Sequence, residues 1–166
     1  MKILIRMAGL LVLISGLAGL VRGQALLPGT TAGMKVEDVQ KLFPEAHAPE
    51  NTEPLPGGHV LQLLEVDRLV IAEHAFRVKF FFNDERLVKV TLFESGDILE
   101  KDFAKLRDLI RAKYGHEDST TSSDAIQLNW KAVQTTLRLK WTPARRDEAT
   151  LLLTYEAPIP KESERL

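Results

Sequence analysis

The sequence predicts an α+β fold in which antiparallel strands pack against helices on one face. Two observations support this prediction. Residues 97–115 (DILEKDFAKLRDLIRAKYG) have the pattern of an amphipathic helix, and two groups of short strand patterns with alternating polar and apolar residues flank it. Because a helix with one apolar stripe needs an apolar surface to cover that stripe, we expect the strands to form a sheet against it.

The predicted helix over residues 97–115 has clear boundaries. Ser95 or Asp97 can cap its start, and Gly115 stands where a left-handed residue would end it. Its apolar residues recur at steps of three or four: Leu99, Phe103, Leu106, Ile110 and Tyr114.

The chain before this helix predicts a shorter helix and three strands. Residues 33–43 form the helix, with Val36, Val39 and either Leu42 or Phe43 on its apolar side. Residues 44–58 hold four prolines and two glycines and predict a loop, which we expect to be mobile and which is a second candidate contact surface. The strand patterns cover residues 60–66, 74–82 and 87–93, with Val88, Val90 and Leu92 on the apolar side of the third strand.

The same order returns after the main helix. A polar loop over residues 117–124 precedes strand patterns at residues 126–130, 135–141 and 150–155. Trp130, Trp141 and Tyr155 lie at the ends of these strands on the apolar side, where core packing is favoured over stacking on a ligand.

The chain therefore predicts a tandem α-β-β-β repeat. The expected segments are a signal peptide (1–25), a first unit (26–95), a second unit (96–158) and a disordered tail (159–166). The two units can pair into one continuous sheet or pack separately.

The first 25 residues have the pattern of a secretory signal. Lys2 and Arg6 precede an apolar run over residues 7–21, and Gly23-Gln24-Ala25 has the small-x-small pattern of a cleavage site. The alternative is a retained membrane anchor, but the run is 15 residues long, whereas a spanning helix needs about 20. We therefore expect cleavage and a periplasmic or secreted protein without a stable membrane span.

Charge and cysteine content exclude several classes of function. Removing residues 1–25 removes three of the 22 basic residues and none of the 23 acidic ones, so the remainder holds 19 basic and 23 acidic residues, a net charge of −4. This balance argues against nucleic-acid binding. With no cysteine in the chain, disulfides, thiolate nucleophiles and cysteine metal sites are all excluded.

The first half of the chain resembles the BamE/SmpA-like envelope modules. The resemblance rests on Gly33-Met34, a short helix with Val36, Val39 and Leu42 or Phe43, Pro44 soon after, and a β-meander. The doubled arrangement is similar to the β-lactamase inhibitory protein class, which sets two such units in tandem and binds partners on a sheet surface. The chain departs from BamE in lacking the lipid-attachment cysteine. The resemblance implies a small exported binding or accessory protein and brings no catalytic residues.

Motifs for chemistry are sparse. His47, His59, His74 and His116 lie in different segments, with no pair at the spacing of metal ligands. Glu65 and Asp67 are close in sequence, but solvated acids are the usual interpretation at a strand end, and no nucleophile elbow or phosphate-binding loop is present. We therefore expect no catalytic residue, metal or cofactor.

A second feature is the charge on the polar side of the strands. An acidic protein with a basic sheet face can steer an acidic protein or an anionic envelope component towards that face. The alternative is that these side chains only keep an exposed sheet face soluble and guard its edges. The candidate binding residues are Arg77, Lys79, Phe81, Lys89, Arg138 and Lys140.

These observations favour an exported, non-enzymatic binding or accessory protein of the cell envelope that acts through protein–protein contacts. The first alternative is an inhibitor or immunity-type protein that blocks a secreted enzyme, which requires one tight soluble partner. The second is a small hydrolase or ligand carrier, which requires a deep polar pocket.

Overall fold

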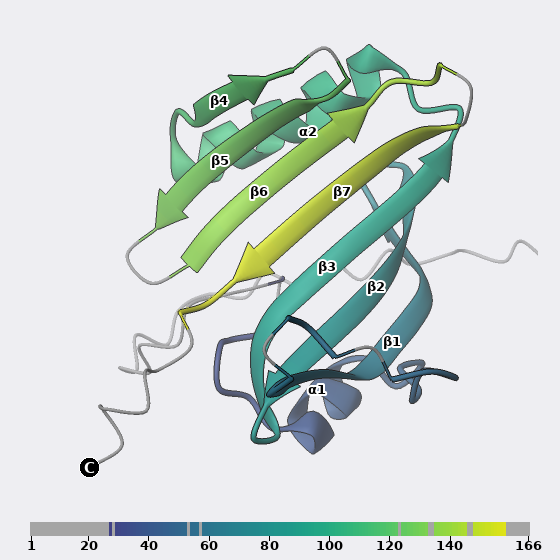
Figure 1. The fold of residues 1–166 in the computed structure, drawn as a ribbon, viewed down its shortest axis with the longest axis vertical. Helices are drawn as coiled ribbons and strands as arrows, with labels where there is room; N and C mark the ends of the chain where they lie inside the picture. Colours follow the sequence, from purple (N-terminus) through teal and green to yellow (C-terminus); the bar gives the residue numbers. More distant parts are fainter. Residues whose placement is uncertain are drawn as a thin grey trace, which may run out of the picture.

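The described part of the protein is a seven-stranded antiparallel sheet with two helices on one face (Figure 1). The computed structural model describes residues 27, 29–52, 54–56, 58–122, 124–132, 135–145 and 148–158. The predicted signal peptide and the predicted tail (159–166) lie outside the described residues. Among the described residues, no helix has the length and apolar character required to cross a membrane.

The strands follow one another in the sheet as β1-β2-β3-β7-β6-β5-β4. Each half is a meander, and antiparallel pairing of β3 with β7 joins the halves into one continuous sheet. The helices are α1 (Val36–Leu42) and α2 (Glu100–Tyr114). The strands are β1 (Val60–Ile71), β2 (His74–Asn83), β3 (Arg86–Gly96), β4 (Asp118–Thr121), β5 (Ile126–Ala132), β6 (Thr135–Thr142) and β7 (Ala149–Glu156).

The helical layer covers the apolar side of this sheet. Phe43, directly after α1, packs its ring 5.3 Å from that of Phe80, and Phe103 of α2 stacks 5.8 Å from Trp141. Both helices contribute to one continuous hydrophobic core. Trp130, Trp141 and Tyr155 are buried in that core, as the sequence predicts.

Helix α2 follows its predicted stripe except at the first position. Phe103, Leu106 and Ile110 are buried, whereas Leu99 is 53% exposed. The helix also begins later than expected: Leu99 is the N-cap residue, and its backbone N–H donates to Asp102 Oδ2 at 3.0 Å. The predicted caps Ser95 and Asp97 are therefore wrong. Gly115 is the C-cap residue and has a φ of 80°, a positive value that glycine adopts without strain.

Two strand predictions need correction. Strand β4 lies within residues 117–124, which the sequence predicts as a loop, and it pairs with β5 at the sheet edge. Val88 is expected beside Val90 and Leu92, but it packs with Val60 and Phe81 in a separate cluster on the other face of the sheet. The cause is a β-bulge: Phe81 pairs with Lys89 while Phe82 pairs with Leu87, so Val88 is the extra residue.

Candidate functional site

The sheet face opposite the helices carries five of the six predicted binding residues as solvent-accessible side chains. Strand pairing places Lys140, Leu152, Phe93 and Arg77 in one row across β6, β7, β3 and β2. A second row runs through Arg138, Thr154, Thr91 and Lys79 on the same strands. In Figure 1 this face is towards the viewer, and α2 lies behind it. We call it the open face.

An apolar pair, Phe93 and Leu152, lies at the centre of the open face, and the sides of the face are basic. Phe93 is 43% exposed, and Leu152 beside it is half-buried. Arg77 and Lys79 lie on one side of this pair, on β2, and Arg138 and Lys140 lie on the other side, on β6. Lys89, on β3, is half-buried and lies opposite Glu156 of β7. The surface thus offers an apolar contact between two pairs of cations.

Phe81 does not belong to this exposed set. It is only 4% exposed, packed against Val60 and Val88, with the partly buried Leu55 beside them, and Lys89 Nζ lies 5.7 Å from its ring centroid. The expectation of an exposed aromatic among the charges is therefore wrong. The segment that contains Leu55 covers the sheet at this point, so the last residues of β2, 80–83, are buried on both faces.

This covering segment, within residues 44–58, pairs with the edge strand β1. His47 and Glu65 exchange two backbone hydrogen bonds, of 3.0 and 2.8 Å, and the N–H of Leu55 donates to the carbonyl of Val60 at 2.9 Å. These bonds satisfy part of the free edge of β1. They also place His47 beside Glu65 at the edge of the sheet.

A polar pocket of about 340 Å³ lies between this segment and the sheet. Its lining includes His47, Glu50, Gln62, Glu65, Asp67, Arg77 and Lys79. Arg77 and Lys79 therefore belong both to the open face and to the pocket wall.

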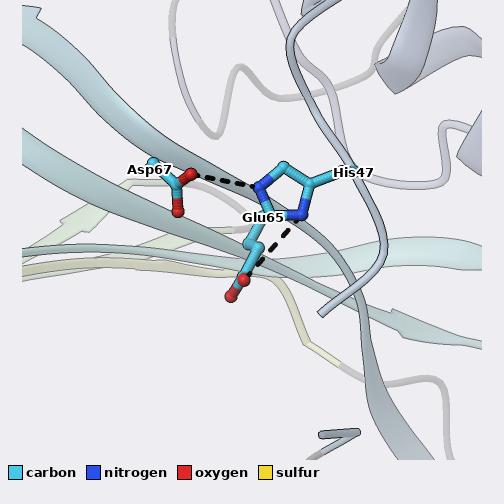
Figure 2. A group of neighbouring side chains, drawn as sticks. All are labelled: His47, Glu65 and Asp67. Carbon is cyan, nitrogen blue, oxygen red and sulfur yellow. Dashed lines mark hydrogen bonds and ion pairs between the residues drawn. The ribbon is translucent and has the colours of Figure 1, made fainter. Parts of the chain in front are cut away.

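The histidine of the pocket lies between two carboxylates (Figure 2). His47 Nε2 is 3.4 Å from Asp67 Oδ2, and Nδ1 is 4.0 Å from Glu65 Oε1. The carbonyl of Ala48, 3.0 Å from Nδ1, and then the Asp67 carboxylate raise the pKa of His47 above its ordinary value of 6.5. The surroundings of His47 therefore favour the protonated form of its imidazole.

Gln62 contacts this cluster through a hydrogen bond to Glu65. Its side chain is buried, and its Nε2 donates to Glu65 Oε2 at 2.9 Å. Within the described part of the chain, no group donates to its Oε1. Burying a carbonyl oxygen without a hydrogen-bond donor destabilises the fold, so the position of this atom calls for an explanation.

The sequence does not indicate that His47, Glu65 and Asp67 lie close together. The histidine is 18 residues from Glu65 along the chain, and the two meet only because the covering segment pairs with β1. The Glu-x-Asp spacing on a strand was the one available signal, since alternate residues share a face. The other three histidines, His59, His74 and His116, do not line the pocket. His74 Nδ1 lies 2.7 Å from Glu94 Oε2, at the start of β2.

Comparison of the chain with protein-family models, with curated proteins and with solved structures finds no match.

Proposed function

We propose that this is an exported, non-enzymatic binding or accessory protein of the cell envelope, acting through protein–protein contacts on its open face. The observation that carries the proposal is the exposed Phe93, with Leu152 beside it, between the basic pairs of β2 and β6. Exposed aromatic and arginine side chains at the centre of a surface are typical of binding hot spots.

The chemistry of the face favours an acidic protein partner. An apolar side chain of the partner would cover Phe93 and Leu152, while carboxylates approach Arg77 and Lys79 on one side and Arg138 and Lys140 on the other. Complementary charge speeds association and fixes orientation. An anionic envelope component is the other partner class that this chemistry suits.

The proposal includes the tandem arrangement. One α-β-β-β unit would comprise α1 and β1 to β3, and the second α2 and β5 to β7, with β4 as an additional edge strand. The antiparallel pairing of β3 with β7 would then join the two units and place β2 and β6 on either side of the join. This order of strands is what brings the two basic pairs to opposite sides of one apolar centre.

A crosslinking pull-down from the native envelope fraction tests the proposal, with the full chain as bait. We expect Arg138→Glu/Lys140→Glu to lose a partner that the unchanged protein captures. The matched control is Lys101→Glu/Lys113→Glu, which makes the same change in net charge on exposed positions of α2 and should retain the partner. Equal capture by all three proteins would contradict docking on the open face.

The identity of the partner separates the alternatives. Tight binding of a single soluble secreted enzyme, with loss of its activity, would favour the inhibitor class. Binding to an envelope assembly would favour the accessory class. Turnover of a substrate by the protein alone would overturn the non-enzymatic assignment.

A further inference from the structure

We infer that His47, Glu65 and Asp67 form a binding site for a divalent transition-metal ion such as Zn²⁺. The site lies in the pocket at the β1 edge of the sheet. Metal binding here does not depend on partner docking, because the three ligands lie on β1 and on the segment paired with it, away from the apolar centre of the open face.

The spacing of the three side chains suits one ion. One ligand atom from each residue lies within 4.8 Å of the other two. His47 Nε2 and Asp67 Oδ2 are 3.4 Å apart, and two ligands bound to one tetrahedral Zn²⁺ lie about 3.3 Å apart at ordinary bond lengths. His47 and Asp67 are exposed and can rotate towards the half-buried Glu65 to complete the coordination.

The orientation of the imidazole supports metal binding through Nε2. Nδ1 lies 3.0 Å from the carbonyl of Ala48, which favours a proton on Nδ1 and leaves the lone pair of Nε2 facing the Asp67 carboxylate. Metal-binding histidines commonly donate their other ring N–H to a backbone carbonyl in this way. A cation between Nε2 and Oδ2 would satisfy both lone pairs.

The buried Gln62 gives an independent indication of a ligand. Its Nε2 holds Glu65 in place at 2.9 Å, and its Oε1 lacks a donor among the described residues of this pocket. Three protein ligands leave a fourth position of a tetrahedral ion open for water. Because Gln62 lines the same pocket, a metal-bound water there is a candidate donor for Oε1.

The charges around the pocket indicate which ion would bind and how strongly. Glu50, Glu65 and Asp67 contribute three carboxylates, and Arg77 and Lys79 contribute two cations that oppose binding of a metal ion. A histidine nitrogen among the ligands favours Zn²⁺ over Mg²⁺ or Ca²⁺. We therefore expect moderate affinity for Zn²⁺ and little response to Mg²⁺.

Isothermal titration calorimetry with ZnCl₂ tests the site. The protein is produced from the full chain without a polyhistidine tag, stripped with a chelator and titrated at neutral pH. We expect one Zn²⁺ per chain. His47→Ala and Asp67→Asn should each weaken binding by about tenfold or more. Because both side chains are exposed, these variants should fold, and circular dichroism checks this.

Matched variants separate coordination from general electrostatics. His116→Ala removes an exposed histidine that does not line the pocket and should leave Zn²⁺ affinity unchanged. Glu50→Gln removes one negative charge from the pocket wall without removing a ligand, and should have a smaller effect than Asp67→Asn. Arg77→Gln should strengthen binding. Absence of a Zn²⁺ heat signal, or equal affinity in His47→Ala and the unchanged protein, would overturn the inference.

Discussion

The two ends of the sheet differ in how their outer face is covered. At the β1 end, the segment within residues 44–58 lies over the sheet and buries Phe81 with Val60 and Val88. At the other end, β6 keeps a regular alternation of buried and accessible residues, because the helices cover only one of its faces. One sheet thus has an end that is covered on both faces and an end that is covered on one.

The difference shows what a run of apolar residues means in a strand. Phe80, Phe81 and Phe82 are consecutive and all buried, since β2 is covered on both faces at this point. In β6, Leu137 and Leu139 are buried, whereas Arg138 between them remains accessible. Alternation therefore indicates one covered face, and its loss indicates two.

The largest expected effect is on the free energy of unfolding, and it distinguishes a phenylalanine that the segment covers from one that is exposed. Phe81→Ala removes a buried ring and should cost about 3–5 kcal/mol of unfolding free energy. Phe93→Ala, at the exposed centre of the open face, should cost less than about 1 kcal/mol while reducing capture of the partner. Urea denaturation measures the loss of unfolding free energy in each variant, and equal losses would contradict the difference in cover.

A smaller effect is expected from loosening the covering segment. Leu55→Ser removes a half-buried side chain from the cluster of Val60, Phe81 and Val88, and should cost about 1–2 kcal/mol. It should also expose residues 44–58 to protease. Leu152→Ser, at a half-buried position of the open face, is the control and should leave cleavage in residues 44–58 unchanged. Limited proteolysis followed by mass spectrometry distinguishes the two.

The edge at β4 should be more sensitive to acid than the edge at β1. Arg111 Nε donates to Glu117 Oε2 at 2.7 Å, directly before β4, and the guanidinium holds the pKa of Glu117 below its ordinary value of 4.5. The stabilisation is thus present above about pH 4.5 and lost as the pH falls through the lowered folded value. Hydrogen exchange should show earlier opening of β4 than of β1 on acidification, and Glu117→Gln should remove this pH dependence.

The smallest effect at neutral pH concerns Tyr155, where β7 joins β3. Burial, and secondarily Tyr114, raises the pKa of Tyr155 above its ordinary value of 10.0. Above about pH 10 the unfolded chain ionises this phenol while the folded chain does not, so stability falls with rising pH. Tyr155→Phe should match the unchanged protein at neutral pH and lose less stability in alkali. Thermal unfolding across the alkaline range measures the difference, and parallel losses would contradict it.

Local patterns predicted most of the elements. The apolar stripe of α2 and the alternation in β2, β5, β6 and β7 gave element types and approximate ranges that the structure confirms. The hairpin between β2 and β3 turns at Asp84 and Glu85, which both have positive φ, as in the turns that suit two-residue hairpins. These features depend on neighbouring residues, which is why they can be read without the fold.

The errors in the strands have one physical origin: each depends on how a strand pairs with, or is covered by, another segment of the chain. Strand β4 is polar and is held by backbone bonds to β5, so its own side chains do not reveal it. Irregular pairing in β1, between Gln62 and Leu64 and again between Val66 and Leu69, interrupts its alternation and hides its length. Val88 changes face because of the bulge, and Phe81 is buried by a segment far from it in sequence.

The sequence by itself determined the α+β class, the main helix, most of the strands and the basic side chains that share one polar face. Only the tertiary structure decided that β3 pairs with β7, that Phe93 and Leu152 lie between the basic pairs, and that His47 meets Glu65 and Asp67. Periodicity reports the environment of each strand or helix separately. Which distant segments meet depends on pairing and covering over the whole chain, which no local pattern records.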